Sequence, residues 1–166
     1  AKLKFRNILY TYRESIHNIA SKQQKIKCFG HVTYCVAGNA GDTVLSQCVR
    51  RMFERVLGVN TWRIIPVNHR ITEKVIQSIN RADALVIGGG GLFLSDTNAN
   101  NISGWQWAIS KDNLDKIERP IIVYSVGYNY FRGQKNSEIF KKSINSFCRK
   151  AAFIGLRNNG SVNAIK

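Results

Sequence analysis

Short, almost wholly apolar runs alternate along this chain with segments in which apolar residues recur at helical spacing. The runs are VTYCV at 32–36, TWRIIPV at 61–67, ALVIG at 84–88, IIVYSVG at 121–127 and AFIGL at 152–156. Helical spacing is found at 5–20, 43–57, 71–80 and 137–151. Strands that lack a polar face are typical of a parallel sheet with helices packed on both sides. The pattern therefore predicts an α/β fold.

The length of 166 residues suits one domain of ordinary size. We therefore expect residues 1–166 to form a single Rossmann-like domain, a doubly wound, mainly parallel sheet of about five strands with helices on both faces. The sequence ends in RNNGSVNAIK, which reads as a loop and the first turn of a helix with no cap. This ending predicts that the chain is part of a longer protein.

The chain is strongly basic, with 25 Lys and Arg against 10 Asp and Glu and a formal net charge of +15. Most of the excess lies at the two ends. Residues 1–27 hold seven basic residues against Glu14, and residues 132–166 hold eight against Glu138. Such a field attracts phosphates, anionic substrates or an acidic membrane face, although the same residues can also simply solvate helix faces. The sequence holds no nucleic-acid-binding module, so we do not expect a nucleic-acid partner.

Several classes of protein are excluded by residues that the chain lacks. The four cysteines form no C-x-x-C pair and no Cys/His cluster at zinc spacing. No apolar run approaches the roughly 18–20 residues of a membrane span, and the basic N-terminus lacks the apolar core of a signal peptide. We therefore predict no metal and no cofactor, and a cytoplasmic location with reduced thiols.

The first candidate site is GNAGD, which lies between the first expected strand and the helix from Thr43. Glycines let a ligand approach the backbone, and a helix N-terminus offers N–H groups to it. From this segment we select Asn39, Gly41 and Asp42. We expect Asp42 to be the N-cap, where its carboxylate would repel a phosphate, and a tight turn with an Asp cap remains the alternative. The segment is not G-x-G-x-x-G and no Walker lysine follows, which argues against NAD and ATP.

Two further candidates follow later strands. Four glycines at 88–91 are more than a tight turn needs, so we predict that a ligand lies against Gly89, Gly90 and Gly91. After the strand at 121–127, Asn129 can direct its amide at a sugar or a carboxylate. For this third candidate an ordinary transition from strand to loop is the alternative.

The fourth candidate is Arg157 with Ser161, after the last expected strand. An arginine at a strand end suits bidentate binding of a carboxylate or phosphate, although a lone arginine is more often a surface residue. The long polar segment 94–118 is expected to form part of the ligand site. Its Trp105 and Trp107 can stack on a sugar ring or anchor the segment, and we favour the anchor. All three histidines are interpreted as structural.

Taken in order, these segments resemble the polysaccharide pyruvyl transferase family. The matching features are GNAGD followed by Val44 and Leu45, ADALVIGGGGLF at 82–93, IIVYSVGYN at 121–129, and R-x-x-x-S at 157–161. Each motif alone is weak, whereas four in this order are fairly specific. This chain has Asn158 where the last motif often has an acid.

The resemblance implies an enzyme that moves a pyruvyl group from phosphoenolpyruvate onto a sugar of an exopolysaccharide or cell-surface glycan precursor, forming a ketal. It also implies two Rossmann-type domains facing a cleft, similar to GT-B glycosyltransferases, of which this chain is the N-terminal half. Arg157 would bind the carboxylate or phosphate of the donor, and the glycine segments would line the cleft floor. The general acid, expected to be a histidine, would lie in the second domain, so we expect residues 1–166 to be inactive alone.

The partners that follow from this resemblance are phosphoenolpyruvate and a sugar or lipid-linked glycan acceptor. We also hypothesise that the basic ends contact the anionic inner face of the membrane. Two other functions remain open at this point. One is a GT-B-type glycosyltransferase that uses a nucleotide sugar, and the other is a non-catalytic module that binds a glycan or a partner.

Overall fold

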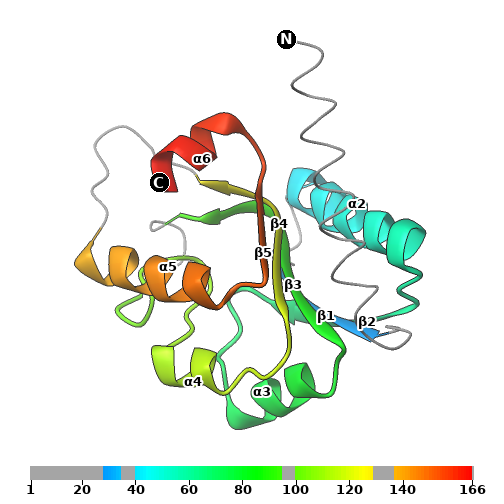
Figure 1. The fold of residues 1–166 in the computed structure, drawn as a ribbon, viewed down its shortest axis with the longest axis horizontal. Coiled ribbons are helices and arrows are strands. Elements are labelled where there is room, and N and C mark those ends of the chain that lie inside the picture. Colours follow the sequence, from blue (N-terminus) through cyan, green and yellow to red (C-terminus); the bar gives the residue numbers. More distant parts are fainter. Residues whose placement is uncertain (1–27, 35–39, 95–99, 129–136, 166) are drawn as a thin grey trace.

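A five-stranded parallel sheet forms the centre of the computed structural model, which describes residues 28–34, 40–94, 100–128 and 137–165 (Figure 1). Its strands are β1 (Cys28–Thr33), β2 (Thr61–Pro66), β3 (Ala84–Phe93), β4 (Ile121–Tyr128) and β5 (Phe153–Leu156). All of the pairings between neighbouring strands are parallel. The predicted α/β, Rossmann-like fold is confirmed. The helix expected at 5–20 lies outside the described residues.

The strand order is β2-β1-β3-β4-β5. The chain moves outward from β1 to β2, returns across β1 to β3 and then continues in the opposite direction, which is a doubly wound arrangement. The two directions part between β1 and β3. In open sheets of this kind, ligands bind outside the carboxyl ends of the strands at such a switch point.

Helices cover both faces of the sheet. On one face lies α2 (Ala40–Leu57), whose Val49 and Phe53 pack with Phe29 and Val86 of the strands. The other face carries α3 (Glu73–Asn80), α4 (Lys111–Asp115) and α5 (Glu138–Lys150) over the larger apolar core. The last helix, α6 (Asn159–Ile165), follows the carboxyl end of β5 (Figure 1). In the first halves of β3 and β4, residues 84–87 and 121–124, alternate residues point to opposite faces, as buried parallel strands require.

Side chains cap the starts of three helices, of which α4 lies in the polar segment 94–118, where no helix was predicted. The hydroxyls of Thr72, Ser110 and Ser137 accept hydrogen bonds from backbone N–H groups in the first turns of α3, α4 and α5. The start of α2 differs from the prediction. It begins at Ala40, so Asp42 lies within the first turn and is not the N-cap. An acidic side chain in this turn still favours the helix through its charge.

Two strands also differ from their predicted bounds. β1 occupies Cys28–Thr33 and not 32–36. The prediction missed its first residues because Gly30 and His31 interrupt the apolar pattern. β3 does not end in a turn at its glycines but continues through all four of them to Phe93. Its pairing with β4 shifts register between Gly90 and Phe93, which marks an irregularity in the ladder.

The tryptophans of the polar segment are anchors, as favoured from the sequence. Trp105 and Trp107 are fully buried in the larger core, where their rings contact each other and Phe147 of α5. The indole N–H of Trp105 donates to Ser143 Oγ at 3.1 Å. Their burial leaves neither ring exposed for stacking on a sugar.

Candidate functional site

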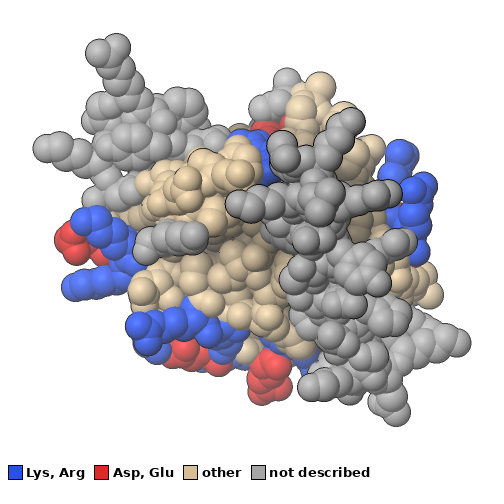
Figure 2. Space-filling model, turned by 45° about the horizontal axis from the view of Figure 1, so that its top comes forward, with Lys and Arg blue, Asp and Glu red and all other residues tan. Residues whose placement is uncertain are grey.

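The predicted site residues come together at the carboxyl edge of the sheet wherever the structure describes them. Gly41 and Asp42 lie in the first turn of α2, and the glycines of β3 run beside the end of β4. Arg157 and Ser161 follow β5. Asn39 and Asn129 lie outside the described residues. Figure 2 tilts this edge toward the reader; where the described residues are visible, uncharged residues fill much of the surface, and charged residues, mostly Lys and Arg, lie toward the margins of the view.

At the switch point, polar side chains of β1 connect it with β3 and α2. The backbone pairing of β1 with β3 ends at Val32 and Ile87. His31 is still paired with Val86, but its side chain reaches past the last pair, where Nε2 lies 3.2 Å from the carbonyl oxygen of Gly88. Beyond the last pair, Thr33 Oγ1 shares a hydrogen bond of 2.5 Å with Ser46 Oγ of α2. These side chains tie the glycine segment and α2 to β1 where the ladder no longer does.

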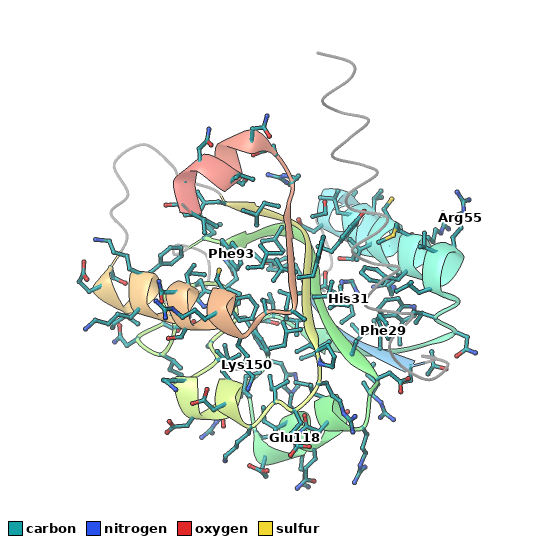
Figure 3. All side chains as sticks on the ribbon, in the orientation of Figure 1. Phe29, His31, Arg55, Phe93, Glu118 and Lys150 are labelled. Carbon is teal, nitrogen blue, oxygen red and sulfur yellow. The ribbon has the colours of Figure 1, made fainter. Side chains whose placement is uncertain are left out.

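His31 is a neutral structural residue. Its ring is fully buried on the α2 side of the sheet (Figure 3). Its pKa is lowered to about 4, chiefly by burial; the hydrogen bond to the Gly88 carbonyl opposes this shift, and the charge of the nearby Arg50 adds a smaller lowering effect. Arg50 Nη1 donates to Nδ1 at 3.3 Å, so the ring proton lies on Nε2 and is donated to Gly88. The structural role expected for this histidine agrees with these contacts.

Protein atoms already lie against the first two glycines of the segment. A Cβ on Gly88 would lie 2.3 Å from the carbonyl oxygen of Tyr124. A Cβ on Gly89, whose φ is +80°, would lie 2.9 Å from both N and Cα of Ser46. Close packing against β4 and α2 therefore accounts for these two glycines without a ligand. A ligand contact at Gly89 stays a prediction.

The next glycines bring two predicted segments together. Gly90 is buried and Gly91 half-buried. A Cβ on Gly90 would lie 3.3 Å from Oδ1 of Asp42, so the carboxylate of α2 reaches the bare backbone of β3. Asp42 itself is half-buried. In this corner a negative oxygen lies beside the peptide groups of Gly90 and Gly91, an arrangement that suits hydroxyl groups better than phosphate.

The guanidinium of Arg157 lies over Gly127. A Cβ on this glycine would lie 2.6 Å from Nη2 of Arg157, 2.8 Å from its Cζ and 3.1 Å from its Nε. The backbone N–H of Arg157 donates to the carbonyl of Val126 at 2.9 Å. Only a residue without a side chain permits this approach. The sequence indicated Arg157 as a site residue but gave no sign that its guanidinium packs on Gly127.

The serine of R-x-x-x-S completes this unit. Ser161 is buried, and its Oγ accepts a hydrogen bond from the N–H of Tyr128 at 3.0 Å. Asn158 Oδ1 accepts one from the N–H of Ser161 at 2.8 Å and so caps α6. Asn158, which stands where the motif often has an acid, therefore has a structural part to play. Arg157 and Ser161 together bracket the end of β4.

The comparison with known families agrees with this arrangement. Residues 7–166 match the family model described as polysaccharide pyruvyl transferase. The chain belongs to this family. A search of curated proteins found no match. Membership in the polysaccharide pyruvyl transferases implies a transferase that acts on polysaccharide, and confirms the resemblance seen in the four motifs.

Two features of the described residues bear on metal binding and on membrane insertion. Within the described ranges, no group of three or more His, Cys, Asp or Glu side chains is arranged to hold a metal ion. Among the helices that the structure describes, none is both long enough and apolar enough to cross a membrane.

Proposed function

We propose that this protein transfers a pyruvyl group from phosphoenolpyruvate to hydroxyl groups of a sugar in an exopolysaccharide or cell-surface glycan precursor. The observation that carries the proposal is the guanidinium of Arg157, seated on Gly127 at the carboxyl edge of the sheet in a member of this family. A planar guanidinium presents paired N–H donors that match a carboxylate or a phosphate. Phosphoenolpyruvate carries both groups.

The proposed chemistry needs charge neutralisation. Protonation of the methylene carbon makes C2 electrophilic, one sugar hydroxyl then adds to C2 and loses its proton, and a second hydroxyl displaces phosphate to close the ketal. Negative charge on the donor opposes each approach by an oxygen nucleophile, so a fixed cation lowers the barrier. In this proposal Arg157 supplies that cation, and the overall excess of +15 raises the local concentration of the anionic donor.

The acceptor sugar would bind on the neighbouring strands. Gly90, Gly91 and Asp42 form a corner in which a carboxylate oxygen lies beside glycine backbone, and Gly91 and Asp42 are half-buried. Sugar hydroxyls donate to carboxylates and accept from peptide N–H groups. We also assign to this surface Gly41, in the first turn of α2, together with Asn39 and Asn129, which precede α2 and follow β4 in the sequence. Their contribution is part of the proposal.

The remaining parts of the reaction are assigned outside this chain. We place the general acid in a second domain, as in a GT-B-like enzyme whose N-terminal half is residues 1–166. On this proposal residues 1–166 alone do not release phosphate from phosphoenolpyruvate. Anionic lipid at the inner face of the membrane is proposed to attract the basic ends of the sequence. Co-sedimentation with vesicles that contain anionic lipid, compared with neutral vesicles, tests that contact.

The central experiment measures phosphate released from phosphoenolpyruvate by the full-length protein in the presence of a glycan acceptor. We expect Arg157→Ala to reduce kcat/KM by about 10- to 100-fold, the equivalent of a lost charge-assisted hydrogen bond. Arg55→Ala is the matched control, because Arg55 is exposed in the last turn of α2, far from the carboxyl edge (Figure 3). Turnover of a nucleotide sugar with no response to phosphoenolpyruvate would refute the proposal.

A further inference from the structure

Two neighbouring strands turn left-handed at the same level. Gly89 of β3 has a φ of +80°, and Ser125 of β4 has a φ of +56°. The register pairs Gly88 with Tyr124 and Gly90 with Val126, so Gly89 and Ser125 lie side by side between these pairs. Among the described residues that are not glycine, Ser125 is the one with positive φ. This conformation is uncommon for a residue with a side chain, and such residues gather at functional sites.

The turn at Ser125 changes which way β4 faces. Before it, Ile121 and Val123 point into the larger core. After it, Val126 points into that same core, although strict alternation from Val123 would direct it to the α2 side. The pairing with β5 shifts register at this point, between Tyr124 and Val126. Relative to β5, Ser125 is therefore an extra residue, a bulge after which the facing of β4 is inverted, while the register with β3 is kept across it.

The inversion decides where Gly127 lies. Because Val126 and Tyr128 both pack on the larger core, Gly127 between them faces the opposite side. On β5, Leu156 also packs on the larger core, so Arg157 leaves the strand toward the same side as Gly127. The close approach of its guanidinium to Gly127 agrees with this facing. If Ser125 instead continued the strand in regular alternation, Val126 and not Gly127 would face the side of the arginine.

We propose that Ser125 is a positioning residue, whose left-handed bulge places the bare Cα of Gly127 beneath the guanidinium of Arg157 and so aims that group at the substrate anion. The identity of the anion as phosphoenolpyruvate rests on the proposed function. The positioning itself rests on the register, the core contacts and the approach of Arg157 to Gly127. In this arrangement the backbone of Ser125 acts, and its hydroxyl is dispensable.

The first test compares Ser125→Gly with Ser125→Val in the full-length protein. Glycine adopts positive φ freely, whereas a β-branched residue resists it. We expect Ser125→Gly to keep KM for phosphoenolpyruvate within about twofold, and Ser125→Val to raise KM by about 10-fold or more with a smaller change in kcat. Equal losses in both variants would mean that the hydroxyl acts, and would overturn the inference.

The second test is a double-mutant cycle. Gly127→Ala should raise KM about 10- to 100-fold in the wild-type background, because the new methyl displaces the guanidinium. In the Arg157→Ala background, Gly127→Ala should change KM less than about twofold. A loss of the same size in both backgrounds would show a general structural defect and contradict the inference.

A third measurement separates this inference from the proposed function. The Nε–H resonance of Arg157, assigned by its loss in Arg157→Lys, should move in Gly127→Ala and Ser125→Val and stay in place in Ser125→Gly. Titration with inorganic phosphate should shift it in the wild type and in Ser125→Gly only. If the protein releases no phosphate from phosphoenolpyruvate, the proposed function fails and this resonance still tests the positioning. An unmoved resonance in Gly127→Ala would overturn it.

Discussion

The packing of α2 on β3 predicts a large and separable cost for Gly89→Ala. A Cβ at residue 89 would lie 2.9 Å from two backbone atoms of Ser46 and 3.1 Å from the carbonyl carbon of Leu45. Backbone atoms in a helix cannot rotate away as a side chain can, so α2 must shift as a whole. Overpacking of this kind costs about 1–3 kcal/mol. The left-handed φ of +80° adds about 1–2 kcal/mol for alanine.

The expected loss in the free energy of unfolding is therefore about 2–5 kcal/mol, a large share of the roughly 5–15 kcal/mol of an ordinary domain. Gly58→Ala provides the matched control. Gly58 is also left-handed, with a φ of +67°, but nothing lies within 4 Å of its Cβ position. It should lose only the conformational part, about 1–2 kcal/mol. The difference between the two variants isolates the steric contribution of the contact with α2.

Urea unfolding followed by circular dichroism measures both losses in the same buffer. Equal shifts of the two midpoints at unchanged slope would refute the reasoning, because they would mean that α2 yields to the extra methyl without cost. A Gly89→Ala loss confined to enzyme activity, with no change in stability, would instead make Gly89 a ligand contact. That outcome would support the role predicted for it from the sequence.

Two further predictions concern His31 and the N-terminal cap of α6. The unfolded state binds a proton to His31 near pH 6.5 and the folded state only near pH 4, so stability should fall by up to about 3 kcal/mol as the pH drops through this window. His31→Gln, which can keep both hydrogen bonds, should remove that fall when urea midpoints at pH 7 and pH 4.5 are compared, and an unchanged pH dependence would contradict it. Asn158→Ala should lower the free energy of unfolding by about 1 kcal/mol, because it removes the acceptor for the Ser161 N–H at the start of α6. Asn158→Asp keeps an acceptor oxygen and should retain this stability, as judged by thermal unfolding. Equal melting temperatures for the two variants would exclude the cap.

Much of the fold was predictable because burial imposes a period on the sequence. The bounds of β2, β4 and β5 and of α3 and α5 agree with the apolar pattern within two residues. The first residues of β1 were missed because a histidine does not look like a buried strand residue. His31 is buried there because Arg50 and Gly88, which are distant in sequence, supply its hydrogen bonds. The second half of β3 was missed because glycines suggest a turn, whereas packing against β4 and α2 keeps them within the strand.

The sequence by itself determined the doubly wound class, the segments that reach the carboxyl edge and the family, since strand period and short motifs are local. Only the tertiary structure decided what those segments do there. The bulge at Ser125 shifts the facing of β4 by one residue, and no local pattern records such a shift. Gly127 comes to lie beneath Arg157 through that shift, and Asn158 and Ser161 hold the pair in place. Register is a property of paired strands, so it becomes visible only once the strands have met.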